Sequence, residues 1–255
     1  MIRASLALAA RALRTSLRRP QFLAPLLLFP SMFLAVNTGG MARATELPGF
    51  DEVNGFLDFQ LAAAMTQSML LGGVTAGIAT ALEIEGGFFD RLVASPVPRT
   101  ALLVGRLLAT GAIAVFQVLW FLAIGLIFGA EIEGGVPGAL VVVLLGIFGG
   151  IGFGAIGMLL AFRAKNASTV QGIFPLVFVV LFVSSAFFPR DLLQSPASWI
   201  ADYNPLSYIA DGLREPIIRG VNAGPVLEGF AAALLVIVVA GGFALLALRN
   251  RLREA

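Results

Sequence analysis

Residues 137–162 read PGALVVVLLGIFGGIGFGAIGMLLAF, a run without a charged side chain. About 20 helical residues cross the roughly 30 Å hydrocarbon layer of a bilayer, so this run is long enough to span it. Gly146, Gly150 and Gly154 recur every four residues within it, and small residues at that interval let two helices approach closely. The run therefore predicts a membrane-spanning helix that packs tightly against its neighbours.

The rest of the chain has the same character. Apolar residues make up 58% of the sequence and charged residues only 13%, and the mean hydropathy of +0.93 lies outside the range of soluble proteins. The apolar runs are too long for the ten-residue alternation of a membrane β-barrel. We therefore predict an all-α integral membrane protein in which residues 1–20 precede a transmembrane domain over 21–255, with six spans at about 21–38, 59–82, 101–128, 137–162, 169–188 and 226–248.

Basic residues set the expected orientation. Of the 17 lysines and arginines, 13 lie near span ends that share one side of the membrane: Arg3, Arg11, Arg14, Arg18, Arg19, Arg91, Arg99, Arg106, Arg163, Lys165, Arg249, Arg251 and Arg253. Basic residues accumulate on the cytoplasmic side of membrane proteins. We expect a multi-pass membrane protein with both termini in the cytoplasm. The pI near 9.7 then reflects a basic rim beside the lipid rather than a nucleic-acid partner.

Residues 2–18 are expected to form an amphipathic helix in the cytoplasmic interface. At 100° per residue, apolar and basic side chains fall on neighbouring arcs of that helix: Ile2, Leu6, Leu13 and Leu17 on one, and Arg3, Arg11, Arg14 and Arg18 on the other. The alternative is a signal peptide, with Ala42-Arg43-Ala44 as a crude cleavage site.

The outer connection at 189–225 is expected to be folded. Ser195-Pro196 and Asn204-Pro205 each place a capping side chain before a proline. Apolar residues then repeat at helical spacing, at Leu206, Ile209, Leu213 and Ile217. We predict two short amphipathic helices that roof the outer end as a lid dipping partly into the membrane, the alternative being a surface hairpin.

Several chemistries are excluded by composition. The chain has no histidine and no cysteine, which removes histidine proton relays, thiol or imidazole metal sites and disulfides. Its single lysine, Lys165, follows no glycine-rich loop, so there is no phosphate-binding motif and no expected ATP hydrolysis. Asp58, Glu83 and Arg106 lie at span ends, which leaves no mid-membrane charge for ion coupling.

Polar side chains inside the spans are candidates for a substrate pathway, because an unpaired amide is costly in hydrocarbon. The candidates are Gln60, Thr66 and Gln67 on the second span with Gln117 and Trp120 on the third. Interhelical hydrogen bonding is the alternative for the glutamines. Phe174, Phe178 and Phe182 form a stripe on the fifth span beside Pro175, and this stripe is either part of the pathway or a packing and lipid surface.

Residues 83–99 carry the longest charged insertion on the predicted cytoplasmic side. Their apolar residues recur at helical spacing, Asp90 and Arg91 lie on another face, and Pro96 and Pro98 prevent the helix from continuing. We predict a short surface helix here. A membrane protein without a motor of its own could use such a helix to dock one.

This segment, EIEGGFFDRLVASPVPR, followed by Leu102-Leu103-Val104-Gly105-Arg106, resembles the coupling-helix signature of ABC-2-type exporter permeases, especially the daunorubicin-resistance type. Phe187-Phe188-Pro189, Trp199-Ile200, Asn204-Pro205-Leu206-Ser207-Tyr208 and Asp211-Gly212-Leu213-Arg214 are similar to the outer re-entrant segment of that family. One departure is Gly86-Gly87-Phe88-Phe89, where relatives commonly have Gly-Thr followed by an apolar and an acidic residue.

The resemblance implies a permease subunit of the bacterial cell (inner) membrane that carries out no catalysis itself. Two copies would form the pore and join two copies of a separate ATP-binding cassette ATPase, which holds the ATP and Mg; this chain binds no cofactor, and its other contacts are with membrane lipid. The implied cargo is an amphipathic drug, natural product or lipid-like molecule. A permease for lipid-linked polysaccharide, a gradient-driven carrier and a non-transporting membrane anchor are the alternatives.

The resemblance also assigns site residues. The residues expected to contact the ATPase are Glu83, Glu85, Gly86, Phe88, Phe89, Asp90, Arg91, Ser95, Pro96 and Arg99. The two phenylalanines are expected to fill a pocket on that partner. The outer gate falls to Phe188, Pro189, Trp199, Asn204, Pro205 and Tyr208.

Overall fold

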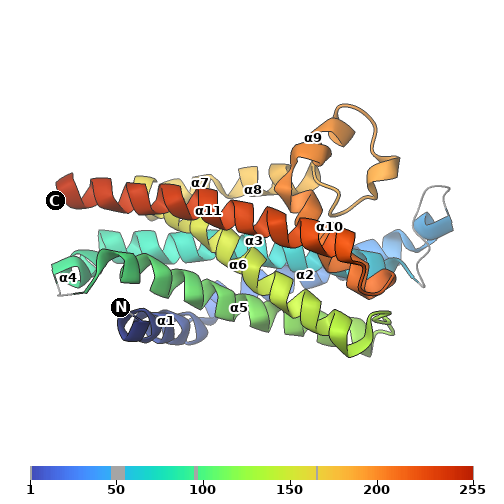
Figure 1. Cartoon of the computed structure of the whole chain (residues 1–255), viewed down its shortest axis with the longest axis horizontal. Helices are drawn as coiled ribbons and strands as arrows, with labels where there is room; N and C mark the ends of the chain where they lie inside the picture. Colours follow the sequence, from blue (N-terminus) through green and yellow to red (C-terminus); the bar gives the residue numbers. More distant parts are fainter. Residues whose placement is uncertain (1, 47–54, 95–96, 165, 255) are drawn as a thin grey trace.

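The computed structural model describes residues 2–46, 55–94, 97–164 and 166–254, and these ranges contain helices and no strand. Within these ranges, five helices are long and apolar enough to cross a membrane. They are α2 (Pro20–Gly40), α3 (Phe56–Glu85), α5 (Arg99–Ile127), α6 (Gly135–Ala164) and α11 (Ala223–Glu254). The long helices run side by side in one bundle (Figure 1). The all-α membrane class is thus confirmed.

Glycines on α6 let this helix pack closely against three neighbouring helices. A side chain at Gly154 would collide with Thr110 of α5, and one at Gly157 would collide with the backbone of Gly73 on α3. Gly152 lies against α11. Small residues therefore face three neighbours at once, which explains why α6 packs closely against α3, α5 and α11.

The predicted span at 169–188 is not one long helix. It forms α7 (Ala167–Gly172) and α8 (Phe174–Phe182), which are separated at Ile173 and followed by turns. Pro175 occupies the first turn of α8, where a proline is tolerated because its missing N–H is not needed there. The six-span count is therefore not confirmed, although α7 and α8 still carry the chain along the bundle (Figure 1).

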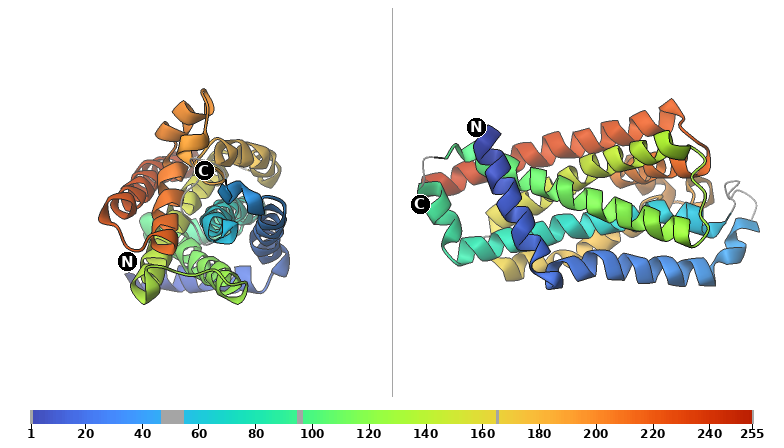
Figure 2. Two further views of the ribbon diagram at one scale, coloured as in Figure 1. Left: turned by 90° about the vertical axis from the view of Figure 1, so that its right-hand side faces the viewer. Right: turned by 90° about the horizontal axis from the view of Figure 1, so that it is seen from below.

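Both termini lie at one end of the bundle, which we call the basic end (Figure 1). α1 (Ile2–Leu17) crosses the long helices obliquely there (Figure 2), close to α5, where Gly105 faces Leu8 and the Ser5 carbonyl. The short helix α4 (Phe88–Ala94) lies at the same end. The predicted helices at 2–18 and within 83–99 are both present.

The opposite, outer end carries the remaining short elements: η1 (Ala42–Glu46), η2 (Arg190–Leu192), α9 (Ala197–Tyr203) and α10 (Pro205–Ile218). Asn204 caps α10 by accepting a hydrogen bond from the Leu206 N–H, as expected. Ser195 does not cap α9, because Pro196 precedes its first residue and makes no side-chain cap.

The two outer helices differ in depth. Leu206, Ile209, Leu213 and Ile217 are all buried, and α10 lies against α3, α6 and α11. α10 is therefore inserted among the long helices, deeper than a surface hairpin would be. α9 stays on the outside, with Trp199 and Tyr203 largely exposed.

Candidate functional site

The candidate coupling surface begins where α3 ends. Gly87 adopts a φ of 66°, a left-handed value that favours glycine, and this turn starts α4. Asp90 and Arg91 are exposed on α4. Gly86 and Arg99 are exposed as well, whereas Ser95 and Pro96 fall outside the described residues. The exposed part of the predicted coupling set is thus polar.

Phe89 is not part of that exposed surface. It is 0% exposed and packs in a cluster with Ile84, Leu103 and Phe162, its ring centroid 5.6 Å from that of Phe162. The prediction that Phe89 fills a pocket on a partner is therefore wrong, because the apolar face of α4 is covered by this chain's own long helices. Phe88 is half-buried.

Glu83 joins three helices at the basic end. Its carboxylate accepts a hydrogen bond from Arg11 of α1 at 3.1 Å and another from Arg106 of α5. Arg106 also donates to the Thr80 hydroxyl at 2.7 Å, and the Arg11 guanidinium lies 3.9 Å from the centroid of the Phe88 ring. We call Glu83, Arg11 and Arg106 the basic-end cluster.

Glu85 connects the same region to α7. Its carboxylate accepts a hydrogen bond at 2.8 Å from the backbone N–H of Ala167, the first residue of α7. Glu83 and Glu85 therefore act within the chain. A force applied to α4 can reach α1 and α5 through the rings of Phe88 and Phe89, which lie beside Arg11 and Arg106. It can reach α7 through Glu85 at the end of α3.

The predicted pathway residues are mostly enclosed in the protein. Thr66 donates to the Ala62 carbonyl of its own helix, and Gln117 donates to the Ser68 carbonyl of α3 at 2.8 Å. Gln117 thus makes the interhelical hydrogen bond that was the alternative interpretation. Trp120 is exposed on α5 and donates to the Ser31 hydroxyl of α2 at 3.2 Å.

Gln60 and Gln67 are different. Both are 1% exposed, and neither amide atom of Gln67 nor the Gln60 Oε1 has a hydrogen-bond partner among the described residues. Because they are seven residues apart, they lie on nearly the same face of α3. Gln60 lines a small cavity of about 130 Å³ together with Phe33, Asn37, Phe182 and Phe188.

The aromatic stripe packs against α2. The Phe178 ring lies 5.5 Å from that of Phe29, and the Phe182 ring lies 6.1 Å from that of Phe33. The side chain of Phe174 falls outside the described ones. Packing therefore accounts for the described part of the stripe, and Phe182 and Phe188 also border the cavity at Gln60.

The predicted outer-gate residues have separate roles. Asn204 is buried, and its amide donates to the Val180 carbonyl of α8 at 2.8 Å. The Tyr208 hydroxyl donates to the Asp202 carbonyl. The other gate residues form no common surface, since Pro189 is buried, Pro205 is half-buried at the first turn of α10, and Phe188 and Trp199 are exposed.

A polar cluster that the sequence reasoning did not assign lies beside them. The Arg214 side chain is only 7% exposed; it pairs with Asp211 at 2.7 Å and donates to the Ala186 and Ser185 carbonyls at 2.7 and 3.1 Å. Asp211 also accepts from Arg190 at 2.9 Å. We call Arg190, Asp211 and Arg214 the outer cluster. The i, i+3 spacing of Asp211 and Arg214 was the available signal.

Arg190 remains charged in this setting. Burial alone would lower the pKa of its guanidinium, but hydrogen bonding to Tyr208 and the nearby Asp211 carboxylate raise that pKa above its ordinary value. Its guanidinium lies 4.3 Å from the centroid of the Tyr208 ring.

This architecture defines a multi-pass helical membrane protein with a short amphipathic helix at its basic end and an inserted helix at its outer end. The profile of the ABC-2 family transporter proteins matches residues 36–247, and the chain belongs to that family. It is also similar to a daunorubicin-resistance ABC transporter permease protein of Streptomyces coeruleorubidus, with 28% identity over 237 residues that cover 91% of this chain and 78% of the relative.

Proposed function

We propose that the chain is the pore-forming half of an exporter that a separate ATP-binding cassette subunit drives through α4. The ABC-2 permease family supports this assignment. The observation that carries it is the connectivity of α4: its outward side presents Asp90 and Arg91, while the adjoining Glu83 and Glu85 contact α1, α5 and α7. Two copies of the permease and two of the ATPase form the complex, with the basic end in the cytoplasm.

In this mechanism the ATPase binds the polar side of α4 and the ATP and Mg stay in that subunit. Closure of the ATPase pair displaces α4, and because Phe89 is anchored in the core, the displacement moves the ends of α3 and α6 with it. The charged residues set the register of docking, since complementary charge gives specificity more than affinity.

The test is co-expression with the ATPase subunit. Asp90→Arg reverses an exposed charge, so the permease should insert normally but co-purify with less ATPase and lose cargo-stimulated hydrolysis. Glu228→Arg makes the same change on an exposed residue at the outer end and should leave both readouts unchanged. Normal complex formation and normal transport in the Asp90→Arg variant would remove α4 as the coupling element.

We propose that the cargo is an amphipathic drug, natural product or lipid-like molecule and that it passes the face of α3 that carries Gln60 and Gln67. Support comes from the named resistance of the Streptomyces relative and from the unpaired amides of that face. A ligand with hydrogen-bonding groups would satisfy them.

Gln67→Leu should therefore change the selectivity among transported compounds with little change in expression. Gln117→Leu is the matched control, because the Gln117 amide already donates to the Ser68 carbonyl. Loss of this hydrogen bond should reduce stability without changing selectivity. Unaltered selectivity in Gln67→Leu, measured as relative efflux of several amphipathic dyes, would contradict this pathway.

A further inference from the structure

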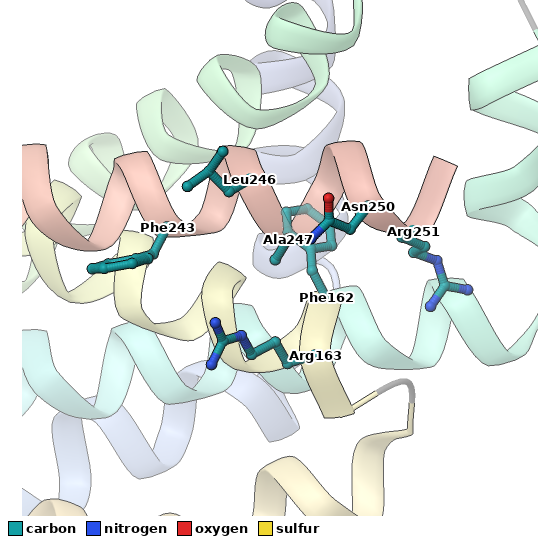
Figure 3. A pocket seen from close by; sticks show the side chains of 7 residues that line it. All are labelled: Phe162, Arg163, Phe243, Leu246, Ala247, Asn250 and Arg251. Atoms are coloured by element: carbon teal, nitrogen blue, oxygen red, sulfur yellow. The ribbon is translucent and has the colours of Figure 1, made fainter. Parts of the chain in front are cut away.

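A groove opens between α6 and α11 at the basic end. Its volume is about 350 Å³, and it is lined by Phe162 and Arg163 of α6 and by Phe243, Leu246, Asn250 and Arg251 of α11 (Figure 3). That volume lies within the roughly 300–1,000 Å³ of typical small-molecule sites. None of the candidate residues discussed above lines it.

The groove holds positive charge without a counter-ion in the described part of the chain. Arg163 is exposed, and no described carboxylate pairs with it or with Arg251. The Nη1 of Arg251 is buried and has no hydrogen-bond partner among the described residues. A buried guanidinium nitrogen without a partner is costly, so an anionic ligand would stabilise this arrangement.

The polar and apolar linings are separated along α11. Phe243 and Leu246 precede Asn250 and Arg251 by one to two helical turns, and both apolar side chains are about half exposed. Because α11 ends at the basic rim, the apolar wall lies toward the middle of the bilayer and the polar groups lie at its surface. A phospholipid has the same arrangement, with its phosphate at the membrane surface and its acyl chains toward the middle of the bilayer.

We propose that this groove binds one anionic phospholipid of the membrane leaflet at the basic end, with an acyl chain along Phe243 and Leu246 and its phosphate at Arg251. The exposed Arg163 side chain, which points away from Arg251 in Figure 3, turns toward the phosphate when the lipid binds. Basic pockets between transmembrane helices at the cytoplasmic surface suit anionic headgroups. The lipid would bridge α6 and α11 beside Phe162, whose ring contacts Phe89 of α4. Lipid binding therefore stabilises the packing of α6 and α11 on which α4 rests. The lipid site is separate from the proposed cargo pathway.

The test uses native mass spectrometry of the full chain in non-ionic detergent, titrated with phosphatidylglycerol or phosphatidylcholine. The wild-type chain should bind phosphatidylglycerol more tightly. Arg163→Gln, an exposed change that spares the core, should weaken that binding about five-fold, and the Arg163→Gln/Arg251→Gln double variant about 25-fold. Arg19→Gln/Arg249→Gln removes the same charge from exposed positions at the same end and should retain wild-type binding.

Three results would overturn the proposal. One is equal binding of the two lipids, and another is an equal loss in the control pair, which would mean general attraction to a basic rim. The third is binding of inorganic phosphate with the same arginine dependence and displacement of phosphatidylglycerol by it, which would make the groove a soluble-anion site.

Discussion

The basic-end cluster and the outer cluster both join helices through arginine and carboxylate groups, but only the outer cluster contains an arginine that also binds buried backbone carbonyls. In the basic-end cluster, the side chains of Arg11, Glu83 and Arg106 are 40%, 22% and 12% exposed. In the outer cluster, Arg190 and Asp211 are 30% and 27% exposed, but Arg214 is 7% exposed and also holds two backbone carbonyls. Water competes for exposed ion pairs and not for buried ones. We therefore expect the contacts between helices at the outer end to stay formed during a transport cycle. The ion pairs at the basic end can break and form again.

The strongest test of this comparison is Arg214→Ala. It leaves the Ser185 and Ala186 carbonyls without their buried donor, whereas Asp211 keeps Arg190 and the Ser185 hydroxyl. We therefore expect a loss of about 2–4 kcal/mol in the free energy of unfolding. Unfolding in mixed micelles measures it. Arg43→Ala, on an exposed arginine of the same outer end, should change stability by less than about 0.5 kcal/mol. Similar small losses in both variants would contradict this comparison.

A change at the middle of the bundle should affect both ends. Gly157→Ala places a Cβ against the Gly73 backbone where α6 crosses α3, and such overpacking costs about 1–3 kcal/mol. Hydrogen exchange should show weaker protection in α4 and in α10 together. A stability equal to that of the wild type would contradict this prediction, because it would mean that α3 and α6 can move apart without a loss of free energy.

Glu83→Gln should have a smaller and local effect. The neutral amide cannot hold both Arg11 and Arg106, and since the pairs are partly exposed we expect a loss of about 1 kcal/mol. Hydrogen exchange of α1 should increase while that of α10 stays the same. Faster exchange in α10 would show that the two clusters are not independent.

The smallest effect is expected at Asp90. Its side chain is exposed, so Asp90→Lys should change the free energy of unfolding by less than about 0.5 kcal/mol. Phe89→Ala, one residue away, removes a fully buried ring and should cost about 3–5 kcal/mol. Thermal unfolding of the two variants separates the polar docking side of α4 from its anchoring side. Comparable losses in both would contradict this division.

Hydropathy was sufficient to predict the long helices, because a bilayer-spanning helix needs an uninterrupted apolar run. Local signals predicted the short elements: prolines bounded α4, and Asn204-Pro205 marked the start of α10. The break between α7 and α8 was missed because the segment remains apolar across Ile173. Only Pro175 hinted at it.

The site was harder to predict than the fold. Periodicity identified Phe89 as belonging to the apolar face of α4, but it cannot say whether a partner or the chain's own helices cover that face. The carbonyls bound by Arg214 lie 28 and 29 residues away in the sequence, so only the tertiary fold reveals the outer cluster. The pathway through Gln60 and Gln67 and the coupling by Asp90 and Arg91 stay predictions.

The segment formed by α7 and α8, which is divided at Ile173, should make the protein sensitive to bilayer thickness. α7 has 6 residues and α8 has 9, so they extend over about 9 Å and about 14 Å, each less than half of a 30 Å hydrocarbon layer. By contrast, α6 has 30 residues and extends over about 45 Å. Hydrophobic mismatch is therefore concentrated at one side of the bundle. Lipids with longer acyl chains should strain the junction at Ile173 first, so transport should vary with acyl length even when headgroup composition is constant.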